Sequence, residues 1–354
     1  MKRILIIRSS AIGDVVMASP LIKGLRKKYP DAHIAWLADP SVQDLLHHHP
    51  DLDQVICWSK DLWKKHLQQG RVISLVKSIR RFSRYLRSQK FDGAIDAQGL
   101  FRSRFFALLS GAGKRIGFQS AEPGKMFMTR IISKGPDDRD MSSEYYHLLE
   151  SLGIDTHDCH PELILSPGDM ENAREKLRRH GITGDYAVIC PFTTRPQKHW
   201  PVHRWAALVK EIENRLGLPV LLLGGPADKG ASRAIAPGGQ GHPFNLTGET
   251  TLGESAAIIR CARLLTGVDT GLTHMGTAFH RPTIALFGAT RPYLYTRSPL
   301  TKVMYHSTEC SPCRRSPTCE GAFHCMESIH VHEVWKNIDE LISVKEHPHA
   351  RSAY

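Results

Sequence analysis

The chain opens with MKRILIIRSSAIGDVV, residues 1–16, and this stretch decides its fold class. We predict a strand over residues 2–7, which contains a short apolar run from Ile4 to Ile7 that is typical of a strand buried in a parallel sheet. Small and polar residues follow it, and apolar residues then recur at helical spacing over 15–29, before Pro30. A strand, a polar turn and a helix in this order begin a βαβ unit, so we predict an α/β fold.

The same alternation continues along the chain and then restarts. We expect strands at 33–38, 53–58, 92–96, 186–191, 220–223, 264–267 and 282–287, and helices at 202–216, 256–262 and 331–344. A polar, proline-containing stretch over 157–168 separates the two series. Because 354 residues are enough to bury two cores, we predict two α/β domains, over 1–165 and 166–330. A final helix and tail follow over 331–354.

The composition is that of a globular protein, with 41% hydrophobic and 23% charged residues. A run of four apolar residues, Ile4 to Ile7, precedes Arg8, which is too short for the core of a signal peptide. The sequence also lacks a run of about 20 apolar residues that would span a membrane. We therefore expect a cytoplasmic protein.

The net charge of +12 indicates an acidic partner, such as nucleic acid, an anionic membrane or a phosphorylated substrate. Between residues 60 and 90 the chain holds ten Lys or Arg and one acidic residue, Asp61. Apolar residues from Val72 to Leu86 recur at helical spacing, and we interpret the stretch as one amphipathic helix with a cationic outer face. Such a helix is either an ordinary solvated surface element or one attracted to anionic lipid headgroups.

The loop after the first strand, residues 8–14, is a candidate ligand site, since ligands of parallel sheets bind beyond the carboxyl ends of the strands. Its small residues let a ligand approach the backbone, and the start of the next helix favours an anion. Asp14 lies at that helix start. It is either a functional carboxylate or a helix cap.

Two loops of the second half suit phosphate groups. Residues 191–200 follow a strand and contain two hydroxyls and several cations, which bind phosphate oxygens well. The alternative for this segment is an ordinary polar loop. Residues 267–274 follow a strand and open a helix, where backbone N–H groups near Gly271 form an anion cradle.

These loops carry a resemblance. The sequence resembles the lipopolysaccharide heptosyltransferases of glycosyltransferase family 9 along nearly its whole length. The matching segments are Ser10-Ala11-Ile12-Gly13-Asp14, Asp96-Ala97-Gln98-Gly99, Lys198-His199-Trp200-Pro201 and Asp269-Thr270-Gly271-Leu272-Thr273-His274. The Asp-Ala-Gln-Gly segment and Thr193-Thr194 are more similar to heptosyltransferase I, which adds the first heptose, than to heptosyltransferase II.

The resemblance implies the GT-B architecture, in which two Rossmann-like domains with parallel sheets face a central cleft. It implies an inverting transfer of L-glycero-D-manno-heptose from ADP-heptose to 3-deoxy-manno-octulosonic acid (Kdo) of the inner core. The N-terminal domain would hold the acceptor, Kdo-lipid A, and the C-terminal domain the nucleotide sugar. The enzyme would need no metal or other cofactor besides its co-substrate ADP-heptose. It would work as a peripheral protein on the anionic cytoplasmic face of the inner membrane.

The resemblance also implies roles for individual residues. Asp14 would be the general base, and an ordinary aspartate is already ionised at neutral pH. Lys198, with the N–H groups of Thr270 and Gly271, would stabilise the departing ADP. The remaining donor candidates are Thr193, Thr194, Asp228, Thr250, Asp269 and His274, and the acceptor candidates are Ser10, Gly13, Gln98, Arg102, Arg104, Lys60, Lys64 and Lys65. Asp228 stands where the family has glutamate, and His274 is alternatively a capping or core histidine.

Four of the eight cysteines are clustered, as Cys310, Cys313, Cys319 and Cys325. In a cytosolic protein such a cluster is either a structural zinc site, a set of reduced thiols, or a set that forms disulfides after isolation. The spacing lacks the paired C-x2-C motifs of zinc ribbons. Cys57, Cys190 and Cys261 lie in apolar segments, and we expect them in the core.

Four other functions are alternatives, two of which the sequence disfavours. A related transferase could act on a later core heptose, like heptosyltransferases II and III. A non-catalytic nucleotide-binding protein would share the fold. Nucleic-acid binding is disfavoured because neither an aromatic stacking platform nor a known motif accompanies the cations, and a dehydrogenase is disfavoured because G-x-G-x-x-G does not follow the first strand.

Overall fold

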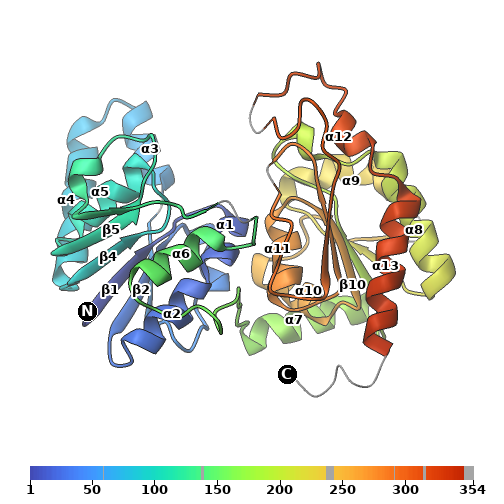
Figure 1. The fold of residues 1–354 in the computed structure, drawn as a ribbon, viewed down its shortest axis with the longest axis horizontal. Coiled ribbons are helices and arrows are strands. Elements are labelled where there is room, and N and C mark those ends of the chain that lie inside the picture. The colour runs from blue at the N-terminus through green and yellow to red at the C-terminus, as the bar shows by residue number, and fades with distance from the viewer. Residues whose placement is uncertain (59, 137–138, 237–242, 291, 314–315, 347–354) are drawn as a thin grey trace. The chain divides into compact units, whose positions relative to one another are not determined.

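The computed structural model describes residues 1–58, 60–136, 139–236, 243–290, 292–313 and 316–346. The chain divides into two compact units (Figure 1). The first comprises Met1–Asp138 and Ser142–Ile164, and the second comprises Arg139–Met141 and Leu165–Tyr354. The short segment Arg139–Met141 joins the second unit because Met141 N–H donates to the carbonyl of Tyr295 (2.9 Å).

The first unit is built on a parallel sheet in the order β3-β2-β1-β4-β5-β6. The strands are β1 (Arg3–Ile7), β2 (His33–Ala38), β3 (Gln54–Cys57), β4 (Gly93–Asp96), β5 (Lys114–Phe118) and β6 (Arg130–Ile132). This is the strand order of a doubly wound Rossmann sheet, in which the winding direction reverses between β1 and β4.

Helices cover both faces of this sheet. Alternate residues of β1 point to opposite faces, so Ile4 and Ile6 pack with one set of helices and Leu5 and Ile7 with another. The first face is covered by α1 (Ile12–Ala18), α2 (Pro20–Lys28) and α6 (Ser143–Ser151), and the second by α4 (Val72–Ser88) and α5 (Phe101–Leu109). Short helices η1 (Pro40–Leu45), α3 (Lys60–Gln68) and η2 (Lys125–Phe127) complete the unit.

The second unit repeats the topology. Its parallel sheet has the order β12-β11-β10-β7-β8-β9, so the reversal falls between β7 and β10. The strands are β7 (Ala187–Cys190), β8 (Val220–Leu222), β9 (Phe244–Asn245), β10 (Leu264–Val268), β11 (Thr283–Phe287) and β12 (Thr301–Tyr305). The helices are α7 (Pro167–Arg179), η3 (Pro196–Lys198), α8 (Val202–Leu216), η4 (Pro226–Asp228), α9 (Lys229–Ile235), α10 (Leu252–Cys261), α11 (Gly271–Ala278), α12 (His324–Glu327) and α13 (Val331–Glu346).

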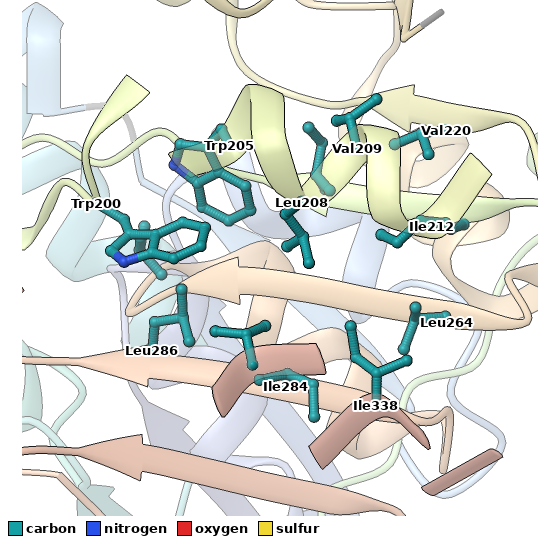
Figure 2. Packing of buried hydrophobic residues seen from close by; sticks show 14 of the residues in the cluster. Trp200, Trp205, Leu208, Val209, Ile212, Val220, Leu264, Ile284, Leu286 and Ile338 are labelled. Atoms are coloured by element: carbon teal, nitrogen blue, oxygen red, sulfur yellow. The ribbon is translucent and has the colours of Figure 1, made fainter. Parts of the chain in front are cut away.

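The core of the second unit lies between its sheet and helices α8 and α13 (Figure 2). Trp200 and Trp205 meet edge to face with ring centroids 5.0 Å apart. Trp200 Nε1 donates to the carbonyl of Ile329 (2.9 Å), so the buried indole N–H is satisfied. Ile338 of α13 reaches the same core, which makes α13 an integral part of this unit.

Two helices that we predicted as continuous are each divided into two. The pattern over 15–29 is interrupted between α1 and α2, where Pro20 supplies no backbone N–H and begins a new helix. The cationic stretch over 60–90 forms two helices, α3 and α4, because Gly70 between them adopts a left-handed conformation with φ of +63°. The α/β fold class with two Rossmann-type sheets is confirmed.

Candidate active site

The candidate residues gather at the carboxyl ends of the central strands of each sheet. In the first unit, Ser10, Gly13 and Asp14 follow β1, and Gln98 follows β4. In the second unit, Thr193, Thr194 and Lys198 follow β7, whereas Asp269, Thr270 and Gly271 follow β10. These are the strands between which the winding reverses, and the crevice beyond such a pair is where open α/β sheets bind ligands.

Asp14 is the third residue of α1. Its Oδ2 accepts the backbone N–H of Ala11 (3.0 Å) and pairs with Arg8 Nη2 (2.6 Å). The first contact closes the first turn of α1, as the cap interpretation expects. The Asp14 side chain is nevertheless 39% exposed, and both contacts fall on one carboxylate oxygen. The geometry therefore combines a capping contact with an accessible carboxylate.

Arg8 is a site residue that the sequence reasoning missed. It is buried, and its second nitrogen, Nη1, donates to the carbonyl of Ala97 (3.2 Å), so it links the loops after β1 and β4. Its own carbonyl accepts the indole N–H of Trp36 (2.9 Å). The signal was a charged residue directly after an apolar strand, where a buried cation requires a partner.

Gln98 and Arg102 also reach the loop after β1. Gln98 Oε1 accepts the hydroxyl of Ser9 (3.1 Å), and Arg102 Nη2 lies 3.4 Å from the same hydroxyl. The Arg102 guanidinium stacks 5.1 Å from the centroid of Trp58, after β3. Asp96 Oδ1 accepts the N–H groups of Gln98 and Gly99 (both 3.0 Å) and so shapes the turn.

The predicted lysines differ in their surroundings. Lys60 Nζ lies 3.8 Å from Asp39 Oδ2, at the end of β2, whereas Lys64 and Lys65 are exposed on α3. Ser10 is half-buried, and Gly13 is buried inside α1. The structure thus brings Gln98, Arg102 and Lys60 to the strand ends of the first sheet.

Arg104 requires a correction. It is fully buried, and its guanidinium donates to the carbonyls of Glu122, Pro123 (2.9 Å) and Phe118 (3.0 Å) and to the Ser120 hydroxyl (2.9 Å). Because two of its nitrogens are already committed to these four oxygens, it holds the chain after β5 in place. The expectation that Arg104 contacts an acceptor is incompatible with this burial.

Lys198 and Asp269 form the centre of the second site. Lys198 Nζ lies 2.5 Å from Asp269 Oδ2 and 3.3 Å from the Asp269 carbonyl oxygen. Asp269 Oδ2 also accepts the Thr290 hydroxyl (2.5 Å). An ammonium has three N–H donors, so this arrangement leaves Lys198 a donor for a further anion.

His274 holds the other oxygen of this carboxylate. Its Nε2 lies 3.2 Å from Asp269 Oδ1, and its Nδ1 lies 2.8 Å from the hydroxyl of Tyr293. His274 is buried, so both ring nitrogens are used within the protein. This geometry matches the core interpretation of His274 and makes it a positioning residue.

The surroundings of Asp269 set its protonation. Burial raises the pKa of Asp269, but the hydrogen bond and charge of His274 and the charge of Lys198 outweigh it, so the pKa lies below its ordinary value. The carboxylate is therefore firmly ionised and keeps Lys198 in one position. Burial raises the pKa of Tyr293, which stays neutral. Thr290 and Tyr293 were missed by the sequence reasoning, although both follow the next strand, β11.

Helix α11 supplies backbone donors beside the ion pair. Thr270 is its N-cap and Gly271 its first residue, and the first N–H groups of a helix have no partner within it. Thr273 Oγ1 donates to the carbonyl of Val268 (2.7 Å) and folds the turn tightly. Gly267 lies in β10, just before this turn, and a Cβ there would be 2.1 Å from that hydroxyl oxygen, so the position leaves no room for a side chain.

The other donor candidates lie on loops of the same sheet. Thr193 is half-buried and Thr194 is exposed. Asp228 Oδ2 accepts the N–H of Gly225 (2.9 Å) and caps η4. The Thr250 hydroxyl lies 2.7 Å from that of Ser255.

All eight cysteines are free thiols. Among the described residues, no group of three or more His, Cys, Asp or Glu side chains is arranged to hold a metal ion. Burial raises the pKa of Cys313 and of Cys325, which favours the neutral thiol. Cys190 is buried as expected, whereas Cys57 and Cys261 are exposed, because each ends an element at the surface.

Membrane spanning is not a feature of the described helices: none is both long enough and apolar enough to cross a bilayer.

Comparison with known proteins identifies the family of this chain. The family model described as glycosyltransferase family 9 (heptosyltransferase) matches residues 79–324, more than two thirds of the chain. Lipopolysaccharide heptosyltransferase 1 of Salmonella typhimurium is 28% identical over 304 residues, covering 82% of this chain and 90% of that protein. Lipopolysaccharide heptosyltransferase 2 of Escherichia coli is 25% identical, covering 97% and 99%.

A solved structure has the same fold. The E. coli heptosyltransferase WaaC with ADP-2-deoxy-2-fluoro heptose superimposes with a TM-score of 0.72 at 22% identity, over 96% of this chain and 99% of that one. This likeness confirms the predicted GT-B fold class. The family match, which covers most of the chain, confirms the predicted resemblance. The chain therefore belongs to glycosyltransferase family 9, the heptosyltransferase family, and is a glycosyltransferase.

Proposed function

We propose that this enzyme transfers L-glycero-D-manno-heptose from ADP-heptose to Kdo of the lipopolysaccharide inner core. The observation that carries the proposal is the Lys198–Asp269 pair beside the start of α11, at the strand ends where the second sheet reverses its winding. A held cation next to free backbone N–H groups suits a diphosphate. The names of the relatives support heptose as the sugar.

The donor-binding part of the proposal concerns the second unit. Lys198 and the N–H groups of Thr270 and Gly271 bind the diphosphate and stabilise the charge that develops as ADP leaves. Thr193 and Thr194 contact the region between diphosphate and sugar, and Asp228 and Thr250 contact the nucleoside. Asp269 acts mainly through Lys198, which it orients.

The catalytic base in the proposal is Asp14. It takes the proton from the acceptor hydroxyl while that oxygen bonds to the anomeric carbon and the bond from this carbon to the phosphate oxygen breaks. One displacement inverts the anomeric centre, so no covalent enzyme intermediate is needed. The ion pair with Arg8 (2.6 Å) supports this role, because it orients the carboxylate without burying it.

The acceptor-binding part concerns the cations of the first unit. Arg102 and Lys60, with Gln98, Ser10 and Gly13 beside them, bind the carboxylates of Kdo, for which a guanidinium and an ammonium are suitable donors. Kdo-lipid A is an acidic lipid, so we propose that the enzyme meets it as a peripheral protein on an anionic membrane surface.

A second candidate is transfer to a later core heptose. It is favoured by one observation, the similar identities to heptosyltransferase 1 (28%), heptosyltransferase 2 (25%) and heptosyltransferase 3 (27%). The Asp96–Gly99 segment favours the first heptose, so Kdo remains our choice.

The test is ADP release by the purified enzyme. We expect release that requires both ADP-heptose and Kdo-lipid A, with donor alone and UDP- or GDP-sugars as controls. If ADP is released only with heptosyl-Kdo-lipid A, the acceptor is the later core heptose and not Kdo. If neither acceptor gives ADP release although ADP still binds, the proposal of heptose transfer to the core is contradicted.

A further inference from the structure

Helices α3 and α4 are amphipathic, yet the rest of their unit covers little of them. α3 contributes no buried residue, and of the 17 residues of α4 only Leu86 is buried. A surface helix of a folded domain ordinarily buries an apolar stripe against the core. The pair is anchored by Trp63 and Phe82, whose rings both contact Phe106 of α5, and Figure 1 shows the three helices grouped at one side of the first sheet.

The turn between the two helices displays apolar side chains to solvent. Leu67 is 67% exposed near the end of α3, and Val72 and Ile73 are 61% and 74% exposed at the start of α4. Val76 lies one turn further along α4 and is also exposed. These four residues, here called the α3–α4 corner, lie within ten residues of one another. Single exposed apolar residues are normal, but a group of four marks a contact surface.

Cations accompany the α3–α4 corner. Residues 60–90 hold ten Lys or Arg and one acid, and so carry nine of the twelve net positive charges of the chain. Lys77, Arg80 and Arg84 follow Ile73 at intervals of four, seven and eleven residues, which places all four on one side of α4. Within the described chain, Lys60 is the one member of the ten with a carboxylate within 4 Å. The outer cations are thus available for an external anion.

We propose that the α3–α4 corner inserts into the surface of an anionic lipid bilayer. Leu67, Val72 and Ile73 would lie at the boundary of headgroups and acyl chains, and the cations of α4 would contact lipid phosphates. An apolar tip with adjacent cations matches the two layers of such a surface, apolar inside and anionic outside. A nucleic acid would match the cations but would leave the aliphatic side chains without a partner, since bases stack on aromatic rings.

This inference rests on the proposed function and extends it. A lipid-linked acceptor is presented at a bilayer surface, and Lys60 at the start of α3 lies beside the acceptor candidates. Because the α3–α4 corner includes the end of α3, its insertion would keep Lys60 and the other acceptor candidates at the level of the lipid headgroups. The inference adds the apolar residues that enter the lipid to the cations that attract it.

The test is co-sedimentation of the full chain with vesicles of phosphatidylethanolamine and phosphatidylglycerol. Variant Val72→Gln/Ile73→Gln removes apolar surface without changing the charge, and we expect about tenfold weaker binding for each side chain. The matched control is Val202→Gln, because Val202 is also an exposed valine at the first position of a helix, α8. It should bind as wild type does. Thermal unfolding checks that each variant is folded.

A second arm separates charge from insertion. Lys77→Gln/Arg80→Gln/Arg84→Gln should weaken binding about a hundredfold, since each cation near an anionic surface contributes about 1 kcal/mol. Hydrogen exchange should show protection of residues 60–88 on vesicle binding. Wild-type affinity in the Val72/Ile73 variant, or equal wild-type binding to phosphatidylcholine vesicles, would overturn the proposal.

The outcome is independent of the transfer reaction. The Val72/Ile73 variant should still release ADP normally with a deacylated, water-soluble Kdo acceptor, because that acceptor needs no bilayer. If no heptose is transferred at all, vesicle binding still tests the corner. If the vesicles are not bound, the transfer assay still tests the proposed function.

Discussion

The two sheets share one strand order but place very different carboxylates at their strand ends. Asp14, after β1, is 39% exposed, and both its contacts fall on one oxygen. Asp269, after β10, is 14% exposed and has partners on both oxygens, from Lys198, His274 and Thr290. Topology sets where such residues stand, and burial sets what they do: an open carboxylate is able to take a proton, whereas an enclosed one orients a cation.

The first prediction tests whether the exposed carboxylate, Asp14, acts as the catalytic base. Asp14→Asn keeps an oxygen that accepts the Ala11 N–H but loses the basic carboxylate, so we expect turnover to fall about 10³-fold. ADP affinity should stay within severalfold and the melting temperature should fall by no more than about 4 °C, as measured by calorimetry. Asp31→Asn, at an exposed acid of the same unit, is the control. Retained turnover would make Asp14 a helix cap alone.

The second prediction tests whether the enclosed carboxylate, Asp269, stabilises the second unit. Asp269→Asn leaves the largely buried Lys198 ammonium without its counter-charge, and we expect the second unit to lose about 3 kcal/mol of unfolding free energy at pH 7. The same change at Asp14 should cost less, about 1 kcal/mol. Arg8 is buried, but it keeps its hydrogen bond to the Ala97 carbonyl, and water reaches the 39% exposed side chain at position 14. Urea unfolding, followed by total tryptophan fluorescence, measures the difference, because each unit contains three of the six tryptophans. An equal loss of unfolding free energy in Asp14→Asn and Asp269→Asn would contradict the distinction between an open and an enclosed carboxylate.

The third prediction tests the role of Lys198, the cation that Asp269 orients. Lys198→Met should lower turnover about 10²-fold, because the departing diphosphate loses its stabilising charge. ADP should also bind more weakly. Lys210→Met, at an exposed lysine of α8, is the control and should behave as wild type in both assays. Normal ADP binding and turnover in Lys198→Met would remove Lys198 from the donor site.

The pH dependence of stability sharpens the comparison. The folded pKa of Asp269 is lowered, so its contribution is complete above the ordinary aspartate pKa of about 4 and is lost as the pH falls below it. Urea midpoints of the second unit should therefore decrease from about pH 4 downward in wild type and less steeply in Asp269→Asn. Parallel pH profiles of the two proteins would contradict this.

The smallest expected effect is at the edge of the Asp269 network. Tyr293→Phe removes the hydrogen bond to His274 Nδ1 and should cost about 1 kcal/mol of unfolding free energy. Turnover should fall less than about tenfold, since Asp269 and Lys198 remain paired. Tyr295→Phe, at an exposed tyrosine two residues away, should change neither quantity. A loss as large as that of Lys198→Met would make Tyr293 part of the chemistry.

Much of the fold follows from local pattern, and the exceptions have physical reasons. The strand over 33–38 and the helix over 202–216 have the predicted bounds, because the strand is apolar throughout after His33 and the helix is strongly amphipathic. Strands β5, β6, β9 and β12 escaped prediction because they lie at or next to a sheet edge and are partly exposed, which weakens their pattern. Gly70 and Pro20 were visible breaks that the apolar periodicity concealed.

The proposed site was accessible from the sequence only to the level of its loops. Each loop that follows a central strand carries residues of the right chemistry, and the motifs with Asp14, Gln98, Lys198 and Asp269 mark them. Their partners were not predictable: Thr290 is 21 residues from Asp269, and Gln98 is 89 residues from Ser9. Arg104 shows the opposite error, since a cation beside a motif proved to be an internal brace.

The sequence by itself determined the alternation of strands and helices, most of the central strands, the loops proposed to hold the chemistry, and the concentration of charge over residues 60–90. These depend on periodicity, turn residues and net charge, which are local properties of a chain. Only the tertiary structure decided that Asp269 is enclosed and Asp14 open, that Arg104 is buried, and that the α3–α4 corner is left uncovered. Burial is decided by which distant segments pack together, and no local pattern records that.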